Sequence, residues 1–232
     1  FQEVSSPHAR IYVNDSDQDT CLAVWLLLNN RRVKGFRSEP LLNRLITIED
    51  LLDATGGGYP LDPNSPVMEE LAWIFAPYVD ARVAGTITKM DAHEMRTTIE
   101  MVLSRITDYA DGGGQTLELD TRYIELGGGP GWSLIEEQGP YARNAFFATC
   151  KNAFVSAKRN DDGTYIYTIG KKSRYVDFPI EVLYERLNRI EGLDTNLGNH
   201  WGGGDTIGGS PRKTGSKLSP EILTIEINRV LI

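Results

Sequence analysis

Cysteine is scarce in this chain of 232 residues, which contains only Cys21 and Cys150. Two thiols so far apart in the sequence suggest neither a disulfide framework nor a zinc site. We therefore expect a reducing, cytoplasmic setting. Long apolar runs are also missing. The almost wholly apolar stretch Thr20–Asn29 is far shorter than the roughly 20 residues that a membrane-spanning helix needs.

An excess of positive charge is absent too, because 24 Lys and Arg residues stand against 32 Asp and Glu residues, giving a formal net charge of −8. Proteins with a general nucleic-acid surface need a basic face that releases counterions. The composition therefore argues against such a surface and against binding to anionic membranes. The apolar content of 41% is ordinary for a globular protein, and the length allows one large or two small domains.

The most unusual stretch that the chain does contain is Trp201–Lys217, in which glycines are mixed with Arg212, Lys213 and Lys217. Glycine lets a backbone approach a ligand closely, and basic side chains attract anions. Ser219-Pro220 then begins a predicted helix. The pattern favours an anion site, most directly for phosphate. A surface loop without a ligand is the alternative.

Acidic residues gather near the beginning of the chain, where Asp15, Asp17 and Asp19 separate a predicted strand, Ala9–Asn14, from a predicted helix, Thr20–Asn29. A strand, a turn and a helix are the opening of an α/β unit. Three neighbouring carboxylates repel one another unless a cation joins them, which suggests a metal site. The alternative is that Asp19 caps the helix and its neighbours face water.

Two further segments carry candidate metal ligands. The predicted helix Leu41–Ala54 has Asp50 near its end, where a carboxylate opposes the helix dipole unless a cation lies close by. Asp91 and Glu94 form the pattern of a capping box for the helix that follows. Asp91 and His93 could share a metal only if that helix begins after Asp91, so capping and metal binding are compatible.

The glycines of Asp111–Gly114 predict a domain boundary, with one domain at 1–111 and a second at 115–232. In the second, Gln115–Leu126 predicts a strand. Asn152–Arg159 and Thr164–Ile169 predict a hairpin with its turn at Asn160–Gly163. Asp177–Gly192 has the apolar spacing of an amphipathic helix with a glycine stop. Together they predict an α+β domain.

In this order the motifs resemble those of the DHH/DHHA1 phosphoesterase superfamily. The clearest resemblance is in the C-terminal half, at Phe154-Val155, Tyr167–Gly170 and Gly202–Gly215, with Ile207–Arg212 the strongest part. In the N-terminal half, Asp17-Gln18-Asp19 resembles the family's D-x-D motif. Asp91-Ala92-His93 resembles its DHH signature, with alanine in place of the middle histidine.

The resemblance implies an α/β fold with a parallel sheet in the N-terminal domain and a C-terminal α+β domain. It implies one or two Mn²⁺ (or Mg²⁺) ions and a catalytic role for Asp17, Asp19 and His93. The implied metal ligands are Asp17, Asp19, Asp50, Asp91 and His93. The implied substrate-binding residues are Gly208, Gly209, Ser210, Arg212 and His200.

Two functions follow as hypotheses. The first is a metal-dependent phosphohydrolase in which a metal-activated water attacks the phosphorus of a small phosphoester or short nucleotide. The second is a non-catalytic protein that binds a phosphorylated ligand and has lost its metal site, which the alanine at position 92 favours. A purely structural protein whose acidic turns only cap helices is a third hypothesis. A homodimer is compatible with each of them.

Overall fold

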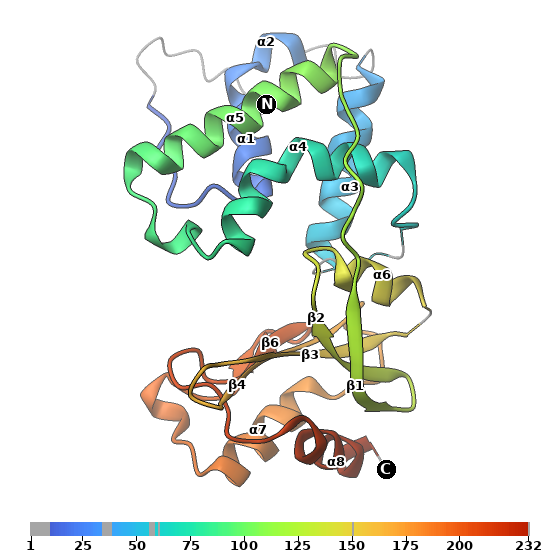
Figure 1. The fold of residues 1–232 in the computed structure, drawn as a ribbon, viewed down its shortest axis with the longest axis vertical. Coiled ribbons are helices and arrows are strands. Elements are labelled where there is room, and N and C mark those ends of the chain that lie inside the picture. Colours follow the sequence, from blue (N-terminus) through green and yellow to red (C-terminus); the bar gives the residue numbers. More distant parts are fainter. Residues whose placement is uncertain (1–9, 34–38, 56–58, 60, 150, 232) are drawn as a thin grey trace. The chain divides into compact units, whose positions relative to one another are not determined.

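The computed structural model describes residues 10–33, 39–55, 59, 61–149 and 151–231. The chain forms two compact units (Figure 1). Unit 1 comprises Phe1–Asp50 and Glu69–Glu118, and unit 2 comprises Leu51–Met68 and Leu119–Ile232. Relative to the expected domains 1–111 and 115–232, the segment Leu51–Met68 belongs with the second unit.

The described part of unit 1 is helical, and its helices begin where the local sequence supplies caps. The carboxylate of Asp17 accepts a hydrogen bond from the amide of Thr20 (2.9 Å) at the start of α1. Ser65 precedes Pro66 at the start of α4, where proline's missing N–H costs nothing. Asp91 and Glu94 form the predicted capping box at the start of α5. The helices of this part of the chain are α1 (Gln18–Leu28), α2 (Asn30–Val33), α3 (Pro40–Ala54), α4 (Pro66–Val83), the 3-10 helix η2 (Ile87–Lys89) and α5 (Ala92–Ala110).

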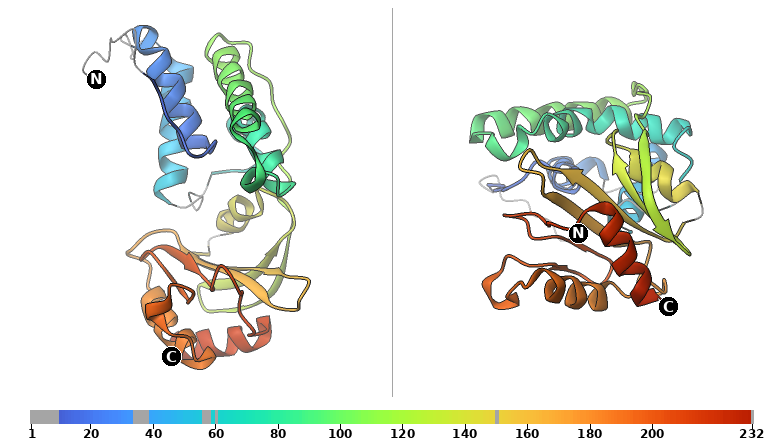
Figure 2. Two further views of the ribbon diagram at one scale, coloured as in Figure 1. Left: turned by 90° about the vertical axis from the view of Figure 1, so that its left-hand side faces the viewer. Right: turned by 60° about the horizontal axis from the view of Figure 1, so that its bottom comes forward.

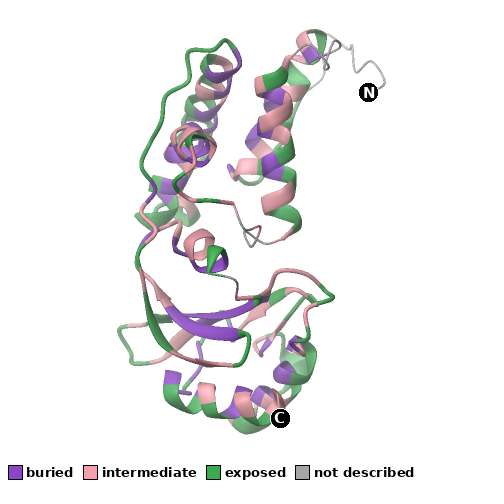
Figure 3. Ribbon diagram, turned by 90° about the vertical axis from the view of Figure 1, so that its right-hand side faces the viewer, coloured by how far each residue is buried: buried purple, intermediate pink, exposed green. Residues whose placement is uncertain are grey.

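Unit 1 has an apolar core built from one face of each long helix (Figure 3). Trp25 of α1 and Val102 of α5 are among its fully buried members. The indole N–H of Trp25 donates to the hydroxyl of Thr107 (2.9 Å), so the contact between α1 and α5 also satisfies a buried donor. Packing of helices through their apolar faces, three of which the sequence predicts at Thr20–Asn29, Leu41–Ala54 and after Asp91, therefore accounts for this unit.

The parallel sheet expected in the N-terminal half is not present among residues 10–33, 39–55 and 61–118, which contain helices and no strand. Residues 10–14 of the predicted strand Ala9–Asn14 are irregular, and Ala9 lies outside the described residues. A strand needs a neighbour that pairs with its backbone. In the other segments of this half, apolar residues recur at helical spacing. Within the described residues, no second strand is therefore present to pair with residues 10–14.

Unit 2 is built on a six-stranded sheet with the order β1-β2-β3-β4-β6-β5. Only the β2–β3 pair is parallel, and the other neighbours are antiparallel. The parallel pair is connected through α6, as a crossover connection requires. The strands are β1 (Tyr123–Gly129), β2 (Trp132–Glu137), β3 (Ala153–Arg159), β4 (Tyr165–Lys171), β5 (Gly202–Gly203) and β6 (Ile207–Gly209), and the helices are α6 (Ala142–Ala148), α7 (Ile180–Glu191), η3 (Thr195–Leu197) and α8 (Pro220–Leu231).

Helices cover both faces of this sheet (Figure 2). Val155 of β3 belongs to the larger apolar core, which includes residues of α7 and α8. Its neighbour Phe154 belongs to a smaller cluster with Phe146 and Phe147 of α6. Successive side chains of a strand point to opposite faces, so α7 and α8 lie on one face and α6 on the other.

Several predictions for unit 2 are confirmed. The hairpin of β3 and β4 turns through Gly163, whose positive φ of 84° suits glycine. Helix α7 ends at Gly192 in the left-handed conformation (φ 65°). The strand predicted at Gln115–Leu126 is wrong in extent, because β1 begins at Tyr123 and continues to Gly129.

Among the described residues, no helix combines the length and the apolar character needed to cross a membrane.

The capping box of α5 allows a direct stability test. We expect Asp91→Ala to lower the free energy of unfolding by about 1 kcal/mol, because the amides of His93 and Glu94 lose their acceptor. Urea denaturation followed by circular dichroism measures the change. Asp108→Ala is the matched control, since Asp108 is an exposed aspartate near the other end of the same helix. An equal loss in both variants would contradict the capping role.

Candidate functional site

The glycine-rich segment Trp201–Lys217, which the sequence presented as a loop, forms the edge of the sheet of unit 2. Gly202–Gly203 and Ile207–Gly209 are the short strands β5 and β6, and they pair with each other. Strand β6 also pairs with β4, so that Gly209 lies opposite Thr168 and Gly208 opposite Ile169. The first part of the segment is therefore an edge hairpin with a defined register.

Two of its glycines are required by close packing. An added Cβ at Gly208 would lie 1.9 Å from the hydroxyl of Tyr184, and one at Gly209 would lie 2.2 Å from the carbonyl oxygen of Tyr167. Both distances are far below any van der Waals contact. These glycines therefore let β6 approach α7 and β4 as well as allowing a ligand to come near the backbone.

A cavity of about 700 Å³ lies beside this hairpin. Ile166 and Thr168 contribute to its wall from β4, and they alternate with Tyr167 and Ile169, which belong to the core beneath α7 and α8. Part of the cavity therefore lies on the sheet face opposite those helices. All five residues that the sequence indicated for substrate binding line it: Gly208, Gly209, Ser210, Arg212 and His200.

Positive side chains stand at this cavity, which we call the glycine-rich pocket, without acidic partners. Arg212 and Lys213 are exposed and line it, and among the described residues neither has an ion pair. The nearby Asp205 instead lies 3.8 Å from Arg174. In a chain of net charge −8, two such cations give this pocket a local positive potential.

The ring of His200 is oriented by its neighbour. Its Nδ1 lies 2.7 Å from the carbonyl oxygen of Trp201, and a carbonyl can only accept, so Nδ1 carries the proton of this bond. Nε2 is then the ring nitrogen left for a ligand. It accepts when the ring is neutral and donates when the ring is protonated.

The backbone around Ser210 is already engaged in the sheet. Its amide donates to the carbonyl oxygen of Tyr167 (3.0 Å), and its hydroxyl accepts from the amide of Tyr167 (2.9 Å). The amide of Lys213 donates to the side chain of Asn199 (3.2 Å). The attraction that this pocket offers to an anion therefore comes chiefly from side chains rather than from these amides.

The sequence indicated Lys213 as a cation of the predicted anion site, although not among the five substrate-binding residues, and it lines the glycine-rich pocket. Among the polar side chains of the lining, Asn199 and Thr168 were missed. Asn199 carries no signal in the sequence, since its contribution depends on the hairpin that brings it beside residues 213 and 214.

The residues indicated for the metal lie in unit 1 and serve several roles. Asp17 caps α1, and Asp91 caps α5 through bonds to the amides of His93 and Glu94. Asp19 lies in the first turn of α1, and Asp50 lies within α3. Among the described residues, no three His, Cys, Asp or Glu side chains are arranged to hold a metal ion. The structure therefore does not bring Asp17, Asp19, Asp50, Asp91 and His93 together as one ligand set.

The acidic turn also influences a thiol. Cys21 is buried, and its sulfur donates to the carbonyl oxygen of Ser16 (3.3 Å). Burial, with a smaller effect of Asp17 and then Asp15, raises the pKa of Cys21 to about 12. A buried thiol with a raised pKa is a poor nucleophile, so we interpret Cys21 as a core residue.

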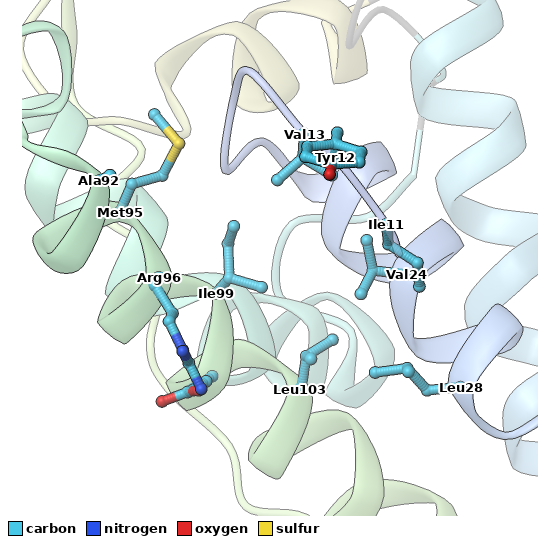
Figure 4. A pocket seen from close by; sticks show the side chains of 11 residues that line it. Ile11, Tyr12, Val13, Val24, Leu28, Ala92, Met95, Arg96, Ile99 and Leu103 are labelled. Carbon is cyan, nitrogen blue, oxygen red and sulfur yellow. The ribbon is translucent and has the colours of Figure 1, made fainter. Parts of the chain in front are cut away.

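A separate cavity of about 510 Å³ lies in unit 1, between α1, α5 and the irregular residues 11–13 (Figure 4). Its lining is mainly apolar, with Val24 and Leu28 on α1 and Ile99 and Leu103 on α5. The charged pair at its side, Arg96 and Glu100, forms its own salt bridge (2.7 Å). This cavity lacks the unpaired cations of the glycine-rich pocket, which is therefore the better candidate for a polar ligand.

Comparison with known proteins gives this chain no relative: no protein-family model, no curated protein and no solved structure matches it. The DHH/DHHA1 resemblance therefore stays a prediction from the sequence. What the structure does show is a mixed fold of helices and one mostly antiparallel sheet.

Proposed function

We propose that unit 2 binds a small phosphorylated molecule, a phosphomonoester or a short nucleotide, in the glycine-rich pocket. The observation that carries the proposal is that Arg212 and Lys213 line a cavity of about 700 Å³ with no ion pair among the described residues. Small-molecule sites have volumes of roughly 300–1,000 Å³, so the cavity has a suitable size.

The chemistry of the two cations suits a phosphate. The planar guanidinium of Arg212 can donate two parallel hydrogen bonds to phosphate oxygens, while the ammonium group of Lys213 acts as a mobile point charge. His200 adds its Nε2 at the same pocket, since its Nδ1 is held by the backbone. Arg212 and Lys213 attract a dianionic phosphate more strongly than a monoanionic carboxylate, because the electrostatic energy grows with the charge of the ligand.

The remainder of the lining suits the uncharged part of a ligand. Gly208 and Gly209 present backbone without side chains, so a flat group can approach closely. Ile166 and Ile207 supply apolar contacts, and Thr168 and Asn199 supply polar ones. This mixture of apolar surface and a few polar groups is typical of small-ligand sites.

Hydrolysis, the first hypothesis from the sequence, is a separate step that would require Mn²⁺ or Mg²⁺ in unit 1. The described carboxylates and His93 form no set of three ligands, so the geometry supports binding and we derive no catalytic step. Incubating 5′-AMP with the protein and Mn²⁺ and measuring released phosphate tests hydrolysis. Release that is lost in an Asp17→Asn/Asp19→Asn variant would establish it, because asparagine at position 17 still caps α1.

The binding proposal predicts that Arg212→Ala weakens the affinity for inorganic phosphate and for 5′-AMP at least about tenfold, because a charge-assisted hydrogen bond is lost. Isothermal titration calorimetry measures the dissociation constants. Arg159→Ala is the matched control: it removes the same charge from an exposed position at the end of β3, outside this pocket. Equal affinity in wild type and Arg212→Ala would remove the main support for the site.

The same proposal predicts a dependence on ionic strength. Arg212 and Lys213 are exposed, so salt should screen their attraction for a phosphate, and the Debye length shrinks from about 10 Å at 0.1 M to about 3 Å at 1 M. We expect the affinity for 5′-AMP to fall steadily over this range in a titration series. Binding that does not respond to salt would indicate an uncharged recognition mode instead.

A further inference from the structure

One carboxylate outside the glycine-rich pocket joins both ends of the glycine-rich segment. Glu191, the last residue of α7, accepts three hydrogen bonds. The indole N–H of Trp201 (2.5 Å) and the hydroxyl of Ser216 (2.9 Å) donate to its Oε2, and the amide of Lys217 (2.7 Å) donates to its Oε1. The two ends of a segment of 17 residues are thus fixed to a single side chain.

The first end is also held by the preceding turn of α7. Asn188 is buried, and its side-chain amide pairs with the backbone of Trp201 in both directions. The Trp201 amide donates to Oδ1 (2.8 Å), and Nδ2 donates to the Trp201 carbonyl oxygen (2.9 Å). Because His200 precedes Trp201 and its ring bonds to that same carbonyl, these contacts also fix the histidine.

The second end carries the cationic turn, Pro211–Gly215, which includes Arg212 and Lys213. This turn is closed by a bond from the amide of Gly215 to the carbonyl oxygen of Pro211 (2.8 Å). Just beyond it, Ser216 exchanges backbone bonds with Tyr165 of β4 (2.7 and 2.9 Å) while its hydroxyl reaches Glu191. The position of the turn therefore depends on β4 and on α7 together.

We propose that Glu191 is the positioning residue of the glycine-rich pocket. It does not line this pocket, and together with the bonds between Asn199 and residues 213 and 214 it holds His200 beside the cationic turn. The inference rests on the proposed function, since positioning matters to a ligand only if one binds beside these residues. A carboxyl group suits this task because its two oxygens accept hydrogen bonds and all three partners are donors.

The test uses Glu191→Gln in the full chain, because glutamine keeps the size of the side chain and places an N–H₂ group among donors. Glu185→Gln is the matched control: it makes the same change on the exposed side of α7. The affinity for 5′-AMP is measured by calorimetry. Amide hydrogen exchange is measured over residues 199–217 and, as an internal reference, over β3.

We expect Glu191→Gln to raise the dissociation constant of 5′-AMP at least about tenfold and to speed exchange over residues 199–217, with exchange in β3 unchanged. Glu185→Gln should match the wild type in both. Arg212→Ala should lose affinity with normal exchange, because Arg212 contacts the ligand and does not hold the segment. This pattern separates positioning from direct contact and from general destabilisation.

Wild-type affinity and wild-type exchange in Glu191→Gln would overturn the inference, as would equally fast exchange in β3. If Glu191→Gln does not fold, Ser216→Ala takes its place, because it removes one of the three donors and leaves the carboxylate. Ser216→Ala should then raise the dissociation constant by a smaller factor and speed exchange near the turn, and the absence of both changes would overturn the inference.

If the wild type binds neither phosphate nor 5′-AMP, the proposed function fails. The exchange data then decide alone whether Glu191 fixes the segment.

Discussion

The edge of the sheet in unit 2 depends on hydrogen bonds that hold two glycine strands, β5 and β6, in place. β5 and most of β6 are glycine, so they contribute almost no apolar surface, and burial cannot hold them in register. Their place comes from hydrogen bonds and from anchors at the ends of the segment. Trp201 is fully buried and stacks on Tyr167, with ring centroids 5.8 Å apart, and Ser210 and Ser216 both bond to β4. The same arrangement places the glycine backbone of β5 and β6 in the lining of the glycine-rich pocket, beside Arg212, Lys213 and His200.

Much of the local structure could be predicted because it depends on neighbouring residues. The capping box at Asp91, the proline start of α4, the turn at Gly163 and the glycine stop at Gly192 each involve a few adjacent positions. The five candidate binding residues came from the family resemblance, and four of them stand in one segment that combines glycines with basic residues. All five of them line one cavity.

The rest depended on contacts between distant residues, which one sequence does not reveal. Nothing around Glu191 or Asn188 indicates that α7 will bond to Trp201, and nothing in residues 202–209 indicates a strand rather than a loop. The expected sheet in unit 1 came from the DHH/DHHA1 resemblance together with one short alternating segment. The carboxylates of Asp17 and Asp91 cap helices; the sequence left capping open for Asp91, and it indicated Asp19 rather than Asp17 as the cap of α1.

The hydroxyl of Tyr184 occupies the space in which the Cβ of a larger residue at position 208 would lie. The hydroxyl of Tyr184 also donates to the carbonyl oxygen of Gly204 (3.4 Å), the residue that follows β5. An added Cβ at position 208 would also lie 2.5 Å from the carbonyl oxygen of Gly202, so a shorter residue at position 184 would not by itself make room for it. Position 208 is therefore restricted to glycine by the neighbouring strand as well as by α7, and we expect descendants of this chain to keep glycine there whatever residue they carry at position 184.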